Sequence, residues 1–461
     1  MTSSQAKVKL LAMMFVTIGV TIAVLAPAQA VAQERATRTP IEHLVFLMQE
    51  NHSFDNYFGT YPGANGLPAD TCIPVDPFAE PDGPCVKPFH IGDTDVQMDD
   101  PDHSEDTHSV QYHDGRLDGF VYALNQRSQD GRLAMGYYDE SDLPYYWNIA
   151  ENYVLFDNFF SSAAGGSNTN HFFWVSATPG LAAAGETQQE TLAETPTIFD
   201  RLQEHGISWK FYVQNYEPGL TYRTLEQYPG NRASQVIWVP LLNFDRFLDD
   251  PELSQHIVNL DEYYEDLANG TLPAVAFIAP SGPSEHPPSS LQSGQRFVKT
   301  LIQRLMQSRY WNNTAFLWAY DDWGGWYDHV PPPQVDDYGF GFRVPALLVS
   351  AYARHNYIDS TLLDYTSVLK FIEDNWGVPP LAERDANANS ISNAFDFSQP
   401  PRQPVILPYE RAGDAIRPAP RRTVIVAFYG GALLLASVVF LLPMRRKSND
   451  PNQATGTGNE K

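Results

Sequence analysis

Residues 44–59 read LVFLMQENHSFDNYFG, an apolar run that passes directly into a polar cluster. A short apolar run of this kind is typical of a buried strand. We therefore expect Glu50 and Asn51 at the carboxyl end of a core strand, where open α/β sheets bind their ligands. The alternative interpretation is a capped turn from strand to helix, with Ser53 or Asp55 as the N-cap.

Apolar strand-like runs alternate with helix-like segments along the rest of the chain. The spacing of Phe297, Leu301 and Leu305, for example, is typical of one face of an amphipathic helix. Strands that alternate with helices predict an α/β fold with a mostly parallel sheet covered on both faces. The expected strands are residues 44–48, 153–156, 208–213, 274–278, 315–319 and 346–350, and the expected helices are residues 197–205, 260–267, 294–308 and 364–376. Residues 214–255 are expected to form an irregular, aromatic-rich insertion or cap.

The composition excludes several classes of protein. The chain has 461 residues, of which 43% are hydrophobic, so it can bury a full core in one large domain or two ordinary ones. Its 55 acidic and 30 basic residues give a net charge of -25. A strongly acidic protein lacks the basic surface that nucleic acid binding requires. Any phosphate site must therefore act through local charge, against the field of the whole protein.

The N-terminus has the pattern of a secretory signal peptide. Lys7 and Lys9 precede an apolar run at residues 10–25, and Ala28-Gln29-Ala30 supplies small residues for cleavage. We expect residues 1–32 to be removed on export, with an uncleaved signal anchor as the alternative.

The C-terminus has the pattern of a membrane anchor. An uncharged apolar run at residues 423–443 is long enough for a transmembrane helix. Basic residues follow it, which predicts a cytoplasmic tail at residues 444–461. The alternative is a buried helix of a soluble protein. We expect a main domain at residues 36–395 outside the cytoplasmic membrane, at the cell surface, joined to the anchor by a Pro-rich stalk at residues 396–422.

The two cysteines, Cys72 and Cys85, lie in a loop rich in proline and aspartate. An even pair in an exported chain predicts one disulfide, and two free thiols are the alternative. Their spacing, with no further ligands nearby, does not match a zinc site.

Five further polar clusters follow the first one in a fixed order. They are DHS at 102–104 with GRLDGFV at 115–121, GGSNTNH at 165–171, SEHPP at 284–288, YDDWGGWYDHVPPP at 320–333 and GFRVP at 341–345. In this order the six clusters resemble the bacterial phospholipase C and acid phosphatase family of phosphoesterases. That family belongs with the alkaline-phosphatase-like hydrolases, and the resemblance runs from about residue 40 to about residue 380. It implies an alkaline-phosphatase-like α/β/α sandwich.

Ser167 is the candidate nucleophile. Two glycines before it allow a tight turn that exposes the hydroxyl, and the resemblance implies a nucleophile near a metal at this position. A helix cap is the alternative role, and the two roles are compatible, since a helix N-terminus also favours phosphate. Asn168 and Asn170 are candidates for binding the phosphoryl oxygens of the substrate. His171 stands where arginine is frequent in the family.

An oxygen-rich set of residues is the candidate metal site. The resemblance implies that Glu50, Asn51, Asp321 and Asp322 bind a divalent metal ion, whose identity (magnesium, calcium, manganese or zinc) the sequence leaves open. The alternative for Asp321 and Asp322 is a turn at a strand end. Adjacent carboxylates repel each other unless a cation or a proton separates them, which favours the metal.

Three histidines in the matched clusters are catalytic candidates. His103 and His286 are expected to contact the phosphate or protonate the leaving group. His329 follows Asp328 and is either a site residue or structural. Arg343 is expected to pair with an interior acid.

The resemblance implies a hydrolase that acts on phosphoric esters. The function we expect is phospholipase C-type cleavage of phospholipids by an exported, membrane-anchored enzyme with a metal-activated serine. The aromatic residues Trp323, Trp326 and Tyr327 would suit a phosphocholine ammonium group, or else belong to the core. One alternative is an acid phosphatase acting on small soluble phosphomonoesters. The other is a catalytically silent cell-surface binding module.

Overall fold

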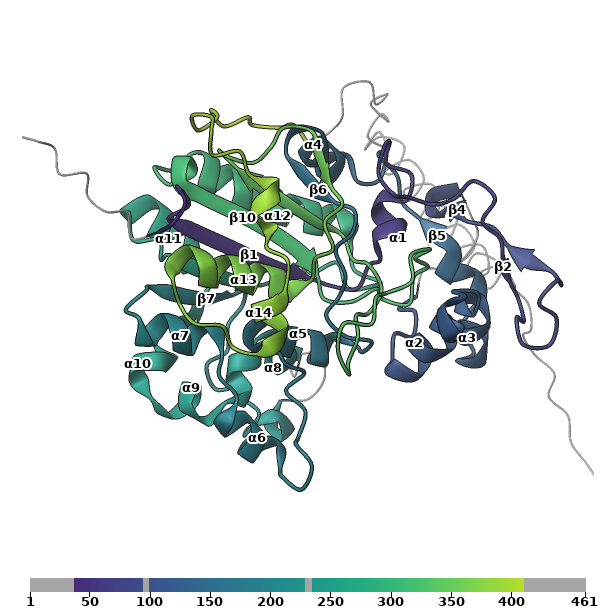
Figure 1. Cartoon of the computed structure of the whole chain (residues 1–461), viewed down its shortest axis with the longest axis horizontal. Coiled ribbons are helices and arrows are strands. Elements are labelled where there is room, and N and C mark those ends of the chain that lie inside the picture. Colours follow the sequence, from purple (N-terminus) through teal and green to yellow (C-terminus); the bar gives the residue numbers. More distant parts are fainter. Residues whose placement is uncertain (1–36, 94–98, 229–233, 410–461) are drawn as a thin grey trace, which may run out of the picture.

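The computed structural model describes residues 37–93, 99–228 and 234–409. Within these residues the core is an eight-stranded sheet in the order β12-β6-β11-β10-β1-β9-β7-β8 (Figure 1). All six expected strands form, and two short strands that the sequence did not indicate, β8 and β12, complete the edges. The strands are β1 (His43–Gln49), β6 (Val154–Phe156), β7 (Trp209–Val213), β8 (Ile257–Asn259), β9 (Val275–Ala279), β10 (Thr314–Tyr320), β11 (Ala346–Ser350) and β12 (Tyr357–Asp359).

The sheet is mostly parallel, as the alternating pattern predicts. Strand β1 pairs in parallel with β10 and β9, and β9 pairs in parallel with β7. The exception is β11, which runs antiparallel to both β10 and β6. In the pairing of β1 with β10, Gln49 lies opposite Tyr320. These two strands therefore end side by side, and the residues that follow them leave the sheet together.

Helices cover both faces of the sheet (Figure 1). Every side chain of β9, β10 and β11 is buried, and successive side chains of a strand point to opposite faces, so each face needs a cover. One layer contains α4 (Pro144–Asn152), α11 (Asp261–Asn269) and α12 (Leu291–Met306), and α12 packs against both of the others. The other contains α5 (Ser167–Ser176), α7 (Ile198–Glu204) and α13 (Tyr365–Trp376).

A smaller lobe, at the right of Figure 1, packs beside the carboxyl edge of β1. It contains α1 (Phe54–Phe58), α2 (Glu105–Tyr112), α3 (Phe120–Gln126) and the short strands β2 (Ile73–Pro74), β3 (Cys85–Val86), β4 (Phe89–His90) and β5 (Gly136–Tyr137). The expected disulfide between Cys72 and Cys85 is present and closes the loop between β2 and β3.

The expected insertion at 214–255 folds into short helices instead of an irregular loop. They include α8 (Gln235–Trp238), α9 (Asp245–Asp249) and α10 (Pro251–Ser254). The remaining helices of the described chain are α6 (Gln188–Glu194) and α14 (Glu383–Asn387).

The two ends of the chain lie outside the described residues, and with them the expected signal peptide (1–32), transmembrane helix (423–443) and tail (444–461). In the described part, the helices are too short or too polar to cross a bilayer. The start of the expected stalk is packed on the domain: the Trp311 indole donates to the carbonyl of Arg402 (2.7 Å), and Arg402 N donates to Ala351 (2.8 Å). These bonds attach residues near 402 to the main domain.

Candidate functional site

Sheet register brings the candidate acids together. Glu50 follows β1 and Asp321 follows its parallel neighbour β10. The backbone N–H of Asp321 donates to the carbonyl of Gln49 (3.0 Å), and Asn51 N donates to Oδ1 of Asp321 (3.0 Å). Two segments far apart in sequence thus form one polar end of the sheet, as the sequence predicts for parallel strands.

Several oxygens at this end are buried and lack a donor. Among the described residues, both carboxylate oxygens of Glu50, Oδ1 of Asn51 and Oδ2 of Asp321 have no hydrogen-bond partner. Buried polar atoms nearly always have a hydrogen-bond partner, because an atom without one loses its hydrogen bonds to water and gains none within the protein. Oxygens of Glu50 and Asp321 lie within 4.8 Å of each other, and oxygens of this kind are the ligands that a hard divalent cation prefers. The residues present therefore fit a metal ion.

Burial and mutual repulsion disfavour the ionised forms of Glu50 and Asp322. Burial, and after it the charges of Asp321 and Asp322, raises the pKa of Glu50 well above its usual range. Burial, followed by Asp321, raises the pKa of Asp322 to about 8, although the charge of His103 opposes this. A nearby cation would reverse these shifts, since it stabilises the ionised form of a carboxylate.

His171 joins this cluster, and the sequence did not assign it. One ligand atom from each of Glu50, His171 and Asp321 lies within 4.8 Å of the others. Nδ1 of His171 donates to the carbonyl of Ser167 (2.8 Å), one helical turn earlier, and burial lowers the pKa of the imidazole. A neutral imidazole with its proton on Nδ1 leaves Nε2, which lies 3.6 Å from Glu50, as a free lone pair. The spacing of four residues between Ser167 and His171 was the signal available in the sequence.

Ser167 is the first residue of α5 and faces this cluster. Its hydroxyl donates to Oδ2 of Asp322 at 3.4 Å. The buried side chain of Asn170 accepts from Ala163 N (3.0 Å) and donates to the carbonyl of Gly165 (2.8 Å). The side chain of Asn170 therefore fixes the turn that presents Ser167.

The backbone at Asn51 adopts a left-handed conformation, with φ of 60°. Non-glycine residues adopt this conformation at some cost, often at functional sites. A Cβ at Gly324 would lie 2.2 Å from the carbonyl oxygen of Asn51, so only glycine allows the two loops to approach this closely. Gly324, two residues after Asp322, thus lets the loops that follow β1 and β10 approach each other.

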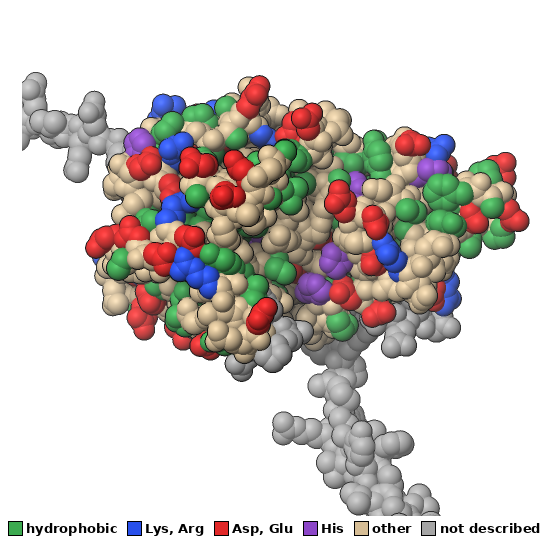
Figure 2. Space-filling view, turned by 90° about the horizontal axis from the view of Figure 1, so that it is seen from below, with side chains coloured by type: hydrophobic (Ala, Val, Ile, Leu, Met, Phe, Trp, Pro, Cys, Tyr) green, Lys and Arg blue, Asp and Glu red, His purple; other side chains and the backbone are tan. Residues whose placement is uncertain are grey.

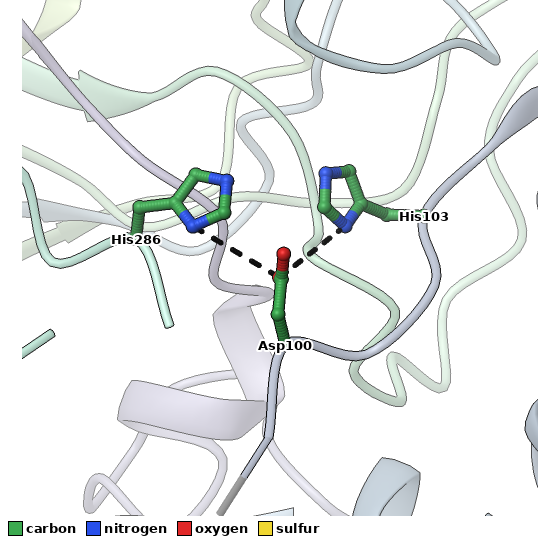
Figure 3. A group of neighbouring side chains, drawn as sticks. All are labelled: Asp100, His103 and His286. Carbon is green, nitrogen blue, oxygen red and sulfur yellow. Dashed lines mark ion pairs between the residues drawn. The ribbon is translucent and has the colours of Figure 1, made fainter. Parts of the chain in front are cut away.

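Two histidines on separate loops point toward Asp100 (Figure 3). Oδ1 of Asp100 lies 3.8 Å from Nδ1 of His103 and 3.9 Å from Nδ1 of His286. Burial on its own lowers the pKa of His103, but Asp322, the Pro101 carbonyl and Asp100 together raise it above its ordinary value. The sequence did not identify Asp100, which carries no motif of its own.

A cleft of about 670 Å³ joins these groups to solvent. Its lining includes Ser167, Asn168, Arg127 and the two histidines. In the space-filling view, imidazole groups lie at the hollow between the two lobes, and acidic side chains are spread over the surrounding face (Figure 2). A phosphate group in this cleft would meet the N-terminus of α5 and the two histidines.

His329 belongs to a different network. Nδ1 of His329 pairs with Oδ2 of Asp55 at 2.6 Å, and the fully buried Arg343 bonds both Asp55 (3.1 Å) and Asp328 (2.9 Å). The expected pairing of Arg343 with interior acids is thus observed. The guanidinium of Arg343 neutralises Asp55 and Asp328. No arginine or lysine plays this part for Glu50 and Asp321 among the described residues.

The aromatic candidates for an ammonium site are core residues. Trp323 and Trp326 are fully buried and Tyr327 nearly so, within the hydrophobic cluster of the smaller lobe. The indole N–H of Trp323 donates to Gln111 on α2 (2.7 Å). A ligand in the cleft cannot stack on rings that are enclosed in this way.

Comparison with known proteins places the chain among phosphoesterases. Residues 41–379 match the model of the phosphoesterase family. The chain is 30% identical to phospholipase C B of Mycobacterium tuberculosis over 79% of each chain, and 28% identical to the non-hemolytic phospholipase C of Pseudomonas aeruginosa over 82% of its own length. It spans only 60% of the length of the Pseudomonas protein. A plant relative, non-specific phospholipase C6 of Arabidopsis thaliana, is 26% identical over 87% of this chain and 81% of that protein.

Among solved structures, a protein in the alkaline phosphatase superfamily from Vibrio parahaemolyticus matches with a TM-score of 0.34 at 12% identity, over 72% of this chain and 66% of that chain. A likeness at this level carries no functional information.

Proposed function

The chain belongs to the phosphoesterase family, and we propose that it is a phosphoric ester hydrolase that cleaves phospholipids or related phosphodiesters in the phospholipase C manner. The observation that carries the proposal is the position of Ser167, an accessible hydroxyl beside buried, unpaired oxygens and at the foot of a cleft. The relatives named phospholipase C support the choice of substrate class.

The residues that would hold a divalent metal ion in this proposal are Glu50, Asn51, Asp321 and Asp322, with His171 beside them. A bound metal ion would supply positive charge that favours the serine alkoxide and the charge that develops on the phosphoryl oxygens. The side chains of the protein supply the nucleophile and the proton for the leaving group.

The proposed reaction proceeds through a covalent intermediate in which Ser167 Oγ is bonded to phosphorus and the second alcohol substituent is retained. Ser167 Oγ releases its proton to water in the open cleft and attacks phosphorus, so that the Oγ–P bond forms as the bond to the leaving alcohol breaks. His286 or His103, in its charged form, gives a proton to the leaving oxygen. Water then attacks phosphorus and passes a proton to the same histidine, and Ser167 Oγ leaves and takes a proton from solvent. Asp322 orients the hydroxyl, and the carbonyls of Pro101 and Pro287 orient the imidazoles of His103 and His286.

Asn168, which lines the cleft, is the remaining candidate for contacts to the phosphoryl oxygens. We assign Asn170 and His329 supporting roles, since their side chains are engaged within the protein.

The proposal includes export and anchoring. The charged and apolar start of the chain, the disulfide between Cys72 and Cys85 and the apolar run at 423–443 support a catalytic domain held outside the cytoplasmic membrane.

The test compares the purified protein with a Ser167→Ala variant on three substrates, each with and without added divalent metal. The substrates are p-nitrophenyl phosphate, p-nitrophenylphosphorylcholine and phosphatidylcholine vesicles. We expect diester and lipid turnover that falls by at least about a thousandfold in the variant, as for removal of a catalytic nucleophile. Turnover of the monoester alone would identify a phosphatase instead. Equal turnover by both proteins would refute the role of Ser167, and a protein inactive on all three would favour a binding module.

A further inference from the structure

A second compartment adjoins the cleft above Ser167 at His286. This second compartment has a volume of about 750 Å³ and is lined by the loops after β7 and β9 and by α8. His286 lines both spaces, so it stands between them. Helix α8 also reaches both, with Ile237 on the serine side and Trp238 on the other. The two spaces therefore adjoin at His286 and at α8.

Polar and apolar side chains both line the second compartment, which carries little positive charge. Among the described residues that line it there is no lysine or arginine, and Glu217 is the single carboxylate. In the part of the chain that the structure describes, no basic side chain pairs with Glu217. The serine side, by contrast, includes Arg127. A mixed lining with one exposed negative charge, that of Glu217, suits a cationic or neutral group rather than an anion.

Glu217 and Trp238 are fixed on the same wall. The buried side chain of Gln235 accepts from Glu217 N (2.9 Å) and donates to the carbonyls of Glu217 (3.0 Å) and Leu220 (3.0 Å). These bonds attach the loop of Glu217 to α8, which carries Trp238 at its end.

We propose that the second compartment binds the polar alcohol substituent of a phosphodiester and that Glu217, with Trp238, selects a cationic or neutral substituent over an anionic one. This inference rests on the proposed function for the orientation of the substrate. A carboxylate and an indole attract a cation by charge and by the electron-rich face of the ring. Both repel an added negative charge at the same place.

The test measures binding, so that it does not depend on turnover. Phosphocholine and inorganic phosphate are titrated calorimetrically into the full-length protein and into Glu217→Gln and Glu217→Lys variants. Glu226→Gln, an exposed acid of the same segment outside the cleft, is the matched control. We expect phosphocholine to bind about three times more weakly to Glu217→Gln and about ten times more weakly to Glu217→Lys, with a smaller effect on phosphate and none in the control.

Equal weakening of both ligands, an unchanged phosphocholine affinity in the Glu217 variants, or failure of the wild-type protein to bind phosphocholine would each overturn the inference. Glu217-dependent phosphocholine binding without hydrolysis of any ester would refute the proposed function and leave the selective compartment in place. The Lys variant also makes a positive prediction: it gains affinity for phosphoserine relative to the wild-type protein, a gain that a damaged fold does not give.

Discussion

The hydroxyl of Tyr320 donates a 2.6 Å hydrogen bond to Oε2 of Glu285, so the last residue of β10 holds the loop that presents His286. Tyr57 donates to the same oxygen (2.7 Å), and Tyr146 donates to Oε1 (2.5 Å). Glu285 is fully buried. Three hydroxyls thus fix a carboxyl group one residue away from a candidate catalytic histidine.

The protein is expected to lose stability between about pH 4.5 and 7 because of Glu285. Burial raises the pKa of Glu285 from 4.5 to about 7, against the three tyrosine hydrogen bonds that lower it. The unfolded chain therefore releases this proton at a lower pH than the folded protein does. The stabilisation of the folded state by protonated Glu285 is fully present below pH 4.5 and is lost as the pH rises to 7. The loss amounts to about 3 kcal/mol. Glu285→Gln should flatten the pH dependence of the urea midpoint over this range; an unchanged slope would contradict the assignment.

Arg343→Met is expected to destabilise the fold by about 3–5 kcal/mol, because it leaves Asp55 and Asp328 buried without a counter-charge. The exposed pair of Arg116 and Asp114 provides the control, for which Arg116→Met should cost less than about 1 kcal/mol. The free energy of unfolding in urea measures both. Similar small values for the two variants would show that Arg343 does not hold this network together.

The core strands could be predicted from the hydrophobic pattern of the sequence, and the residues at their ends from the polar motifs that follow them. Glu50 and Asp321 could be placed together because each ends an apolar run, and parallel neighbours end at one edge. His171 and Asp100 were missed, since their proximity to the site depends on how a helix and a loop pack. The indole rings of Trp323 and Trp326 were uncertain for the same reason, because sequence pattern does not say which side of a glycine-rich turn faces the core.

Metal addition is expected to stabilise the chelator-treated protein against heat. A divalent ion at a concentration one hundred times its dissociation constant adds about 2.7 kcal/mol if it binds the folded state alone. Asp321→Asn removes one of the unpaired oxygens and should reduce the rise in Tm, whereas Asp114→Asn, at an exposed site, should not. The same rise in Tm in both variants would place the metal elsewhere.

The most direct test of the central claim is rapid-quench kinetics with p-nitrophenylphosphorylcholine. If Ser167 is the nucleophile, p-nitrophenol is released with every attack, and the phosphocholine group stays on the enzyme until water removes it. We predict a covalent phosphocholine adduct in acid-quenched protein, mapped by mass spectrometry to the peptide that contains Ser167 and absent from Ser167→Ala. Steady turnover with an adduct on another residue, or undiminished turnover by the variant, would contradict the account.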